Sequence, residues 1–194
     1  MNFLKNIYIW TLKKAGHKNA KWYLSLISFA ESSFFPIPPD MLLIPMALAS
    51  KTKALFYAFI CTLSSVLGGI FGYAIGYFFF NSIGLYIVEF YHLENSFSIF
   101  ENYYKEFGIL IVLGAGITPF PYKFITIASG VFGLNIYLFV IVSIIGRGLR
   151  FYLIAILLYF FGEKIKLFID KYFNILSITF FILLVGSVFI IRFL

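Results

Sequence analysis

The sequence predicts an all-α integral membrane protein: a small helical bundle with two re-entrant broken-helix hairpins, in an inverted-repeat arrangement, and about three full transmembrane helices. Of its 194 residues, 62% are hydrophobic and only 12% are charged, against roughly 45–50% and about 25% in a soluble domain. The apolar stretches have the length of helices and do not alternate every second residue as outer-membrane strands do. We interpret residues 1–194 as one membrane domain.

The first 22 residues are expected to lie on the membrane surface. Residues 1–22 mix five lysines with tryptophan and leucine, and they lack a long apolar core followed by a small-residue cleavage site. Lysines beside membrane segments are typical of the cytoplasmic side, so we place the N-terminus there. The net charge of +7 is then explained by attraction to anionic lipid, and nucleic acid is not expected as a partner.

Residues 23–50 are predicted to form the first re-entrant hairpin. The segment is long enough to span, but prolines at its centre remove backbone donors there: Pro36, Pro38 and Pro39. Such a break is tolerated at membrane depth only where protein or a water-filled cavity surrounds it. Lysines flank both ends of the segment, which places both ends on the cytoplasmic side. Two short helices that meet at a turn satisfy both conditions.

Residues 54–80 are predicted to form a full transmembrane helix. Small residues recur along it every four positions: Ser64, Gly68, Gly72 and Gly76. Such a stripe permits close helix contact, either inside the fold, which we favour, or with a second copy in a homo-oligomer. The next segment, 81–107, carries four glutamates and one lysine among aromatic residues. It is predicted to be an amphipathic surface segment on the opposite side of the membrane.

Residues 108–134 are predicted to repeat the first hairpin. Pro119 and Pro121 break this apolar stretch, and a short apolar half-helix follows. Setting the two Pro-x-Pro breaks over one another puts Asp40 on Lys123. Broken segments at corresponding positions of two halves indicate a transporter-type site at the midplane, and the halves are inverted if the second hairpin enters from the opposite face.

Two further transmembrane helices are predicted at residues 136–161 and 174–191. The segment between them carries Lys164, Lys166 and Lys171, which again indicates the cytoplasmic side. The topology is therefore that of a multi-pass protein of the bacterial inner (cytoplasmic) membrane.

Charged residues at membrane depth are the candidates for function. Arg147 and Arg150 lie near the middle of the span 136–161 and three positions apart, so they share a helix face. Each arginine costs about 2.5–3.5 kcal/mol at the membrane centre, and the only acidic residues at comparable depth are Glu31 and Asp40. One interpretation is that the ion pairs merely pin the first hairpin. Because buried pairs roughly break even in stability, a functional site is the other interpretation.

Lys123 is predicted to join the two arginines in a cationic pocket for one phosphate group. It lies at the start of the second half-helix, where an anion is attracted by the helix end and by the lysine together. Glu31 and Asp40 would hold the cations while the pocket is empty, or take up protons as the anion moves. No His or Cys cluster has metal-ligand spacing, and no Ser-His-acid set lies at membrane depth. We therefore expect no metal, no cofactor and no enzymatic activity.

Residues 29–40, 118–123 and 146–151 read FAESSFFPIPPD, TPFPYK and GRGLRF. These motifs resemble the DedA family, also called the SNARE-associated or VTT-domain superfamily, and especially its YqaA-like branch. The resemblance covers nearly the whole chain. It implies re-entrant hairpins, paired acidic residues and essential arginines. In the second hairpin the sequence departs from the commoner pattern, because Thr118 stands where an arginine usually precedes the prolines, while Lys123 supplies the remaining cation.

In this chain the acidic pair of the DedA pattern matches Glu31 and Asp40, and its arginines match Arg147 and Arg150. The resemblance implies lipid movement across the bilayer. Bacterial members are linked to recycling undecaprenyl phosphate, with a role for proton-motive force, and eukaryotic relatives to phospholipid scrambling. We therefore predict a flippase or scramblase for a lipid phosphate or a phospholipid. Two alternatives stay open: a proton-coupled exporter of small ions or cationic compounds, and a non-transporting membrane organiser.

Overall fold

The computed structural model describes residues 19–35, 37–90, 94–118, 120–162 and 164. Within these residues every regular element is helical and no strand occurs, so the all-helical prediction is confirmed there. Most of the predicted surface segment 1–22 and all of the predicted span 174–191 lie outside the described residues.

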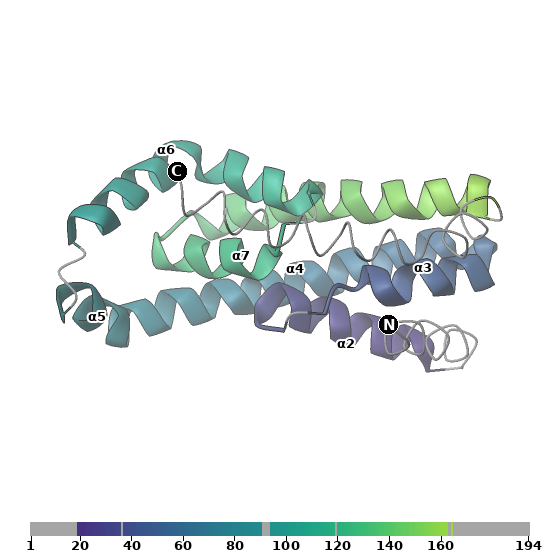
Figure 1. Ribbon diagram of the computed structural model, residues 1–194, viewed down its shortest axis with the longest axis horizontal. Helices are drawn as coiled ribbons and strands as arrows, with labels where there is room; N and C mark the ends of the chain where they lie inside the picture. Colours follow the sequence, from purple (N-terminus) through teal and green to yellow (C-terminus); the bar gives the residue numbers. More distant parts are fainter. Residues whose placement is uncertain (1–18, 36, 91–93, 119, 163, 165–194) are drawn as a thin grey trace, which may run out of the picture.

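Two long helices run along the molecule and carry the shorter ones (Figure 1). One is α4 (Ala54–Phe79), and the other is Ile136–Gly162, which we call the arginine helix. Both are long and apolar enough to cross a membrane. Only 28% of the most apolar window of the arginine helix is buried, and large apolar side chains cover its outer face. A helix in the core of a soluble protein would be mostly buried, so this exposure favours a surface that faces lipid.

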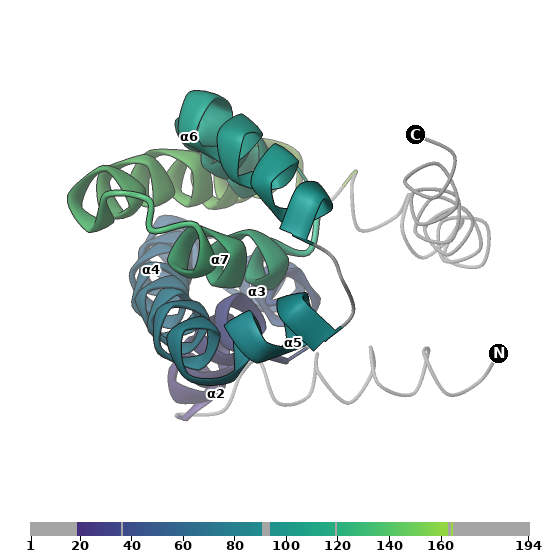
Figure 2. The same cartoon turned by 90° about the vertical axis from the view of Figure 1, so that its left-hand side faces the viewer.

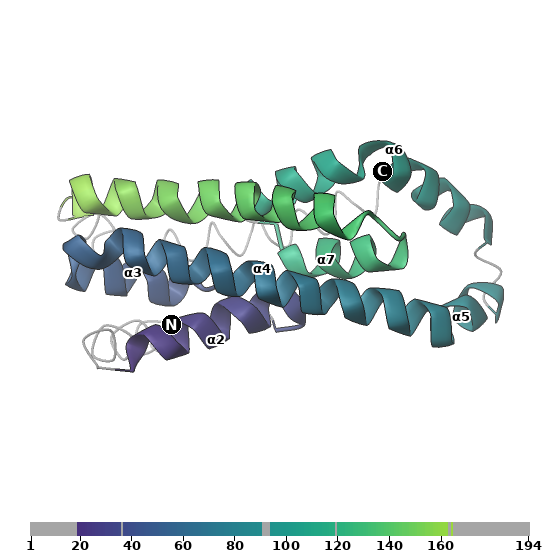
Figure 3. The ribbon, with the colours of Figure 1, turned by 180° about the vertical axis from the view of Figure 1, so that it is seen from behind.

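The first proline break joins two short helices that run in opposite directions. α2 (Ala20–Ser33) ends at Phe34, and α3 (Asp40–Ala49) begins directly after Pro39. Pro39 has a φ of −65°, which the proline ring fixes at the value that a helix start requires. Figures 1 and 3 show this first hairpin packed along one half of α4, and α2 and α3 both contact α4.

The second break has the same plan in the other half of the molecule. α6 (Glu94–Ile117) leads into it, and α7 (Tyr122–Val131) begins directly after Pro121. Gly133, with a φ of 62°, adopts the left-handed conformation that commonly ends a helix. Asn135 then caps the arginine helix by accepting two backbone N–H bonds at 3.0 and 3.2 Å. The turns of the two hairpins therefore fall near the middle of the long axis (Figures 1 and 3).

The stretch between α4 and the second break differs from the prediction of a single surface segment at 81–107. A short turn, Lys51–Lys53, precedes α4, and at its other end α4 continues through a π-helical turn, Phe80–Gly84, into α5 (Leu85–Phe90). Beyond it, α6 crosses the expected boundary at Gly108 without interruption. A glycine inside a helix costs only about 1 kcal/mol relative to alanine, so Gly108 does not divide the segment.

The small-residue stripe of α4 packs inside the fold. A Cβ on Gly68 would overlap the carbonyl oxygen of Phe29 in α2, and a Cβ on Gly76 would overlap the carbonyl oxygen of Ile127 in α7. Gly72 lies between them and faces both α2 and α7. The chain's own helices therefore occupy the face that these glycines would offer to a second copy, and contact inside the fold is the interpretation that the structure shows.

Two apolar clusters fill the bundle, one beside each hairpin. The first joins α2, α3 and α4 to the arginine helix and includes Leu43 and Phe151. The second lies under α6 and α7 and includes Val112, Tyr122 and Phe139. Figure 2, viewed along the long axis, shows α4 at one side of the bundle, next to α2, α7 and the arginine helix. On the arginine helix, the stretch between Phe139 and Phe151 carries the charged side chains.

Candidate functional site

Four charged side chains meet where the two hairpin breaks approach the arginine helix. Glu31 lies in the last turn of α2 and Asp40 is the first residue of α3, so the first break brings both carboxylates together. Arg147 and Arg150 flank Leu149, the central residue of Ile136–Gly162. Two of the prolines that define the breaks, Pro36 and Pro119, lie outside the described residues.

The first ion pair joins Arg147 to Glu31. Nη2 of Arg147 lies 2.6 Å from Oε2 of Glu31, and the two side chains are only 2% and 11% exposed. Nε of Arg147 donates to Oγ of Ser65 at 2.6 Å. Ser65 and Ser32 share a hydrogen bond of 2.6 Å, and Ser32 donates to Glu31 at 3.1 Å. One orientation of the two hydroxyls closes a ring of hydrogen bonds from the guanidinium back to the carboxylate.

Aromatic rings enclose the same guanidinium. Its central carbon lies 4.9 Å from the ring centre of Tyr122 and 4.7 Å from that of Phe151, within the range of a cation–π interaction. The hydroxyl of Tyr122 in turn hydrogen-bonds Ser143 of the arginine helix at 2.5 Å. Because Tyr122 is the first residue of α7, Arg147 connects the first break to the second.

The second ion pair joins Arg150 to Asp40, through Nη2 and Oδ2. Nη1 of Arg150 donates to the carbonyl oxygen of Thr118, which follows the end of α6. This arginine therefore also connects both breaks. Its side chain is 15% exposed and that of Asp40 is 18% exposed. Nε of Arg150 and Oδ1 of Asp40 are buried, and neither has a hydrogen-bond partner in the described part of the chain.

The predicted role of Lys123 in a three-cation pocket stays a prediction. Its ammonium lies 5.4 Å from the ring centre of Phe124, and it forms no ion pair with the described residues. α7 begins one residue earlier, at Tyr122. The helix start therefore aligns Asp40 with Tyr122, whereas the proline superposition aligned it with Lys123. Tyr122, at that position, is the residue whose ring contacts the guanidinium of Arg147, and Lys123 is rotated from it by about 100° around the helix axis.

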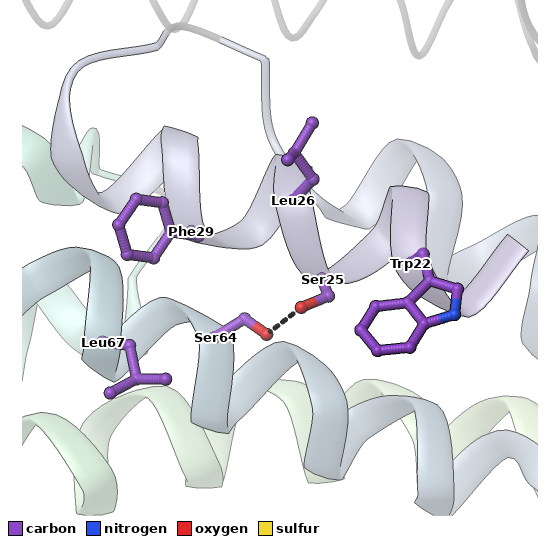
Figure 4. A pocket seen from close by; sticks show the side chains of 6 residues that line it. All are labelled: Trp22, Ser25, Leu26, Phe29, Ser64 and Leu67. Atoms are coloured by element: carbon purple, nitrogen blue, oxygen red, sulfur yellow. Dashed lines mark hydrogen bonds between the residues drawn. The ribbon is translucent and has the colours of Figure 1, made fainter. Parts of the chain in front are cut away.

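A shallow hollow of about 210 Å³ lies on the seam between α2 and α4, away from the ion pairs. Figure 4 shows its lining: Trp22, Ser25, Leu26, Phe29, Ser64 and Leu67. The hydroxyls of Ser25 and Ser64 are bonded to each other across the seam at 2.7 Å. Arg147 and Glu31 are buried, so a ligand reaches them only when the hairpins move apart, whereas Arg150 and Asp40 are partly exposed.

The described residues contain no group of three or more His, Cys, Asp or Glu side chains that is arranged to hold a metal ion. The chemistry of the site is therefore that of its two guanidiniums and two carboxylates. Guanidinium groups recognise carboxylates and phosphates alike by charge-assisted hydrogen bonds. A carboxylate on each arginine thus occupies the position that another oxyanion would take.

Comparison with known proteins finds relatives along the full chain. An uncharacterised protein of Haemophilus influenzae is 34% identical over 192 residues, which is 99% of this chain and 100% of the relative. The chain belongs to its family. A second member, from Histophilus somni and described as an uncharacterised homologue of HI0703, is 34% identical over 167 residues, 84% of this chain and 85% of its own length. No family model and no solved structure matches the chain.

Sequence reasoning missed the neutral partners of the arginines in this member of the family. Ser65 lies next to the small-residue stripe of α4, but a serine in an apolar helix is common and gave no signal of its own. Tyr122 lies inside the second break, but the charge of the adjacent Lys123 made the lysine the expected member of the site. The carbonyl of Thr118 is a backbone group, so only the three-dimensional arrangement reveals it.

Proposed function

We propose that the protein is a flippase-like or scramblase-like lipid transporter of the bacterial inner membrane, which moves a lipid phosphate such as undecaprenyl phosphate, or a phospholipid. The proposal is carried by one observation: two arginines at the centre of one apolar helix each connect both hairpin breaks. Arg147 contacts Glu31 and Tyr122, and Arg150 contacts Asp40 and Thr118. Charges that are buried at the centre of a membrane helix indicate a functional site by default.

The membrane setting is supported by the outer surfaces of the two long helices. α4 exposes Phe56, Phe59 and Phe71, and the arginine helix exposes Ile141 and Leu153. Soluble proteins rarely expose contiguous apolar patches larger than a few hundred Å². In a bilayer these side chains face the acyl chains, and the charged groups turn inward, where each has a partner.

The arrangement of the hairpins supports transport between the two leaflets. In a membrane, α2 and α3 form a re-entrant hairpin from one face, and α6 and α7 form another from the opposite face. Paired broken helices of inverted topology place substrate sites near the midplane in many transporters. Movement of one hairpin opens the arginines to one leaflet, and movement of the other opens them to the opposite leaflet. The resemblance of the three motifs to the DedA family points to the same activity.

A phosphate group is the substrate chemistry that fits two guanidiniums at this depth. Arginine binds phosphate oxygens through paired N–H donors. With the hairpins closed, the carboxylates neutralise the arginines and the site carries no net charge. A lipid head group that enters must therefore displace a carboxylate, and protons taken up by that carboxylate would couple transport to the proton gradient.

The proposal is tested by transbilayer movement of a tail-labelled lipid phosphate in liposomes that hold the purified protein. Wild-type protein should make lipid from the inner leaflet accessible to an external quencher. Arg150→Gln should slow this movement roughly tenfold or more, since a hydrogen bond to a charged group contributes about 1.5–3 kcal/mol. Lys105→Gln is the matched control: it removes a cation on α6 whose side chain is 63% exposed and forms an ion pair with Glu101 on the same helix. It should leave the rate unchanged.

Folded wild-type protein that moves no phosphate-bearing lipid would overturn the transporter proposal. The same liposomes separate the two remaining alternatives. Proton-driven uptake of a cationic compound that Glu31→Gln abolishes would support the exporter. No transport of any tested cargo, together with intact folding, would support the membrane organiser.

A further inference from the structure

The two ion pairs differ in how completely their polar atoms are bonded. In the Arg147–Glu31 pair, both serine hydroxyls and the carboxylate oxygen Oε2 belong to one closed ring of hydrogen bonds. The guanidinium is also held between two aromatic rings. An anion that displaced Glu31 would have to break its bonds to Arg147 and Ser32, and so open the ring, while the arginine remains buried.

The Arg150–Asp40 pair is incomplete in two places. Oδ1 of Asp40 and Nε of Arg150 are buried and have no hydrogen-bond partner among the described residues, and an unsatisfied buried polar group is destabilising. The pair is joined by a single donor and a single carboxylate oxygen, although a guanidinium and a carboxylate can form two parallel bonds. Both side chains are also more exposed than those of the first pair. An oxyanion with a better geometry would satisfy Nε, and Asp40 would be released.

We propose that the pairs have different tasks: Arg147–Glu31 is a fixed anchor of the first hairpin, and Arg150 is the phosphate-binding residue, with Asp40 as its internal competitor. This inference rests on the proposed function, and it names the ion pair in which the phosphate replaces the carboxylate. In the closed state Asp40 occupies Arg150. In the loaded state a phosphate oxygen replaces the carboxylate on Nη2 and Nε, while Nη1 keeps its bond to the carbonyl of Thr118.

Charge balance links this exchange to protons. The closed pair is neutral, and a phosphodiester adds one negative charge. If Asp40 takes one proton from the solvent as it leaves Arg150, the loaded site is neutral again. The other described groups around Asp40 do not replace it as the acceptor of this proton. On the arginine helix and α2, Arg147 and Glu31 are already paired, the neighbouring titratable group on α4 is the Cys61 thiol, and after the end of α6 the carbonyl of Thr118 is bonded to Arg150.

The test uses the full-length protein in detergent and a short-chain phosphatidylglycerol, a phosphodiester whose charge does not change near neutral pH. Short-chain phosphatidylcholine serves as the control for apolar binding, and inorganic phosphate shows whether the lipid tails are needed. The variants are Asp40→Asn, the same carboxylate-to-amide change at Glu31→Gln, and Arg150→Gln. Calorimetry in two buffers of different ionisation enthalpy gives the affinity and the number of protons taken up.

Wild-type protein should take up about one proton per phosphatidylglycerol and bind it more tightly as the pH falls. Asp40→Asn should bind roughly tenfold more tightly at neutral pH, the scale of one charge-assisted hydrogen bond, and should take up no proton. Arg150→Gln should lose binding. Glu31→Gln should not tighten binding. Weaker binding by Asp40→Asn, or tighter binding by Glu31→Gln alone, overturns the division of tasks while leaving wild-type transport to support the proposed function. Absence of binding by the wild type as well as by every folded variant overturns the assignment of Arg150, and the liposome assay then decides the proposed function separately.

Discussion

Replacing Arg147 by alanine is expected to destabilise the fold by about 3–5 kcal/mol, the usual cost of leaving one partner of a buried ion pair behind. The carboxylate of Glu31, whose side chain is 11% exposed, would lose its cation, and Ser65 would lose its donor. A void would also open between Tyr122 and Phe151, whose rings now enclose the guanidinium. Unfolding of the purified protein in mixed micelles measures the effect.

The double variant Glu31→Gln with Arg147→Met separates lost charge from lost packing. If the uncompensated carboxylate causes most of the loss, removing both charges should recover at least half of it, because the double variant leaves no unpaired buried charge behind. A loss below about 1 kcal/mol for Arg147→Ala alone would contradict the anchor role, since it would fall well short of the usual cost of breaking a buried pair.

Adding a single methyl group at Gly76 is expected to cost about 3 kcal/mol or more, at the upper end of what overpacking causes. The new Cβ would overlap the carbonyl oxygen of Ile127, and Gly130 of α7 makes the reciprocal approach to the carbonyl oxygen of Tyr73. Both obstacles are backbone atoms that no side-chain rotation can remove. α4 and α7 would therefore separate, and the second hairpin would lose its packing against α4. The thermal unfolding midpoint of Gly76→Ala measures this.

Gly114→Ala is the matched control for Gly76→Ala. Gly114 also lies inside a helix, α6, but a Cβ there would meet no atom within 4 Å. Alanine is the better helix former by about 1 kcal/mol, so this variant should be as stable as the wild type or slightly more stable. Equal effects of the two substitutions would show that the contact between α4 and α7 is not as close as the structure has it.

Much of the fold follows from local features of the sequence. Prolines disfavour the interior of a helix, although α3 accommodates Pro45, and their fixed φ suits a helix start. Pro39 and Pro121 therefore mark the starts of α3 and α7 correctly. The small residues of α4 likewise identify a face of close contact. The expected boundary at Gly108 was wrong because one glycine is a weak helix breaker, and the π-helical turn after α4 has no comparable signal.

The candidate site was only partly predictable, because its partners are chosen by the three-dimensional arrangement. Four charges at membrane depth limit the ion pairs to a few combinations, and the three-residue spacing puts both arginines on one face. Which carboxylate meets which arginine depends on how α2 and α3 lie against α4. The role expected for Lys123 depended on a superposition of the proline breaks, and a shift of one residue at the start of α7 gave the position to Tyr122.

The two hairpins are expected to enter the membrane from opposite faces and to meet at the arginines. Labelling of single cysteines with an impermeant maleimide, in right-side-out and inside-out vesicles and a Cys61→Ser background, tests this directly. Lys21→Cys and Lys53→Cys, at the two ends of the first hairpin, should react only from the cytoplasmic face. Ser82→Cys and Tyr137→Cys should react only from the opposite face. Reaction of the Lys21 and Lys53 positions from different faces would mean that α2 and α3 together cross the membrane, and would contradict the account.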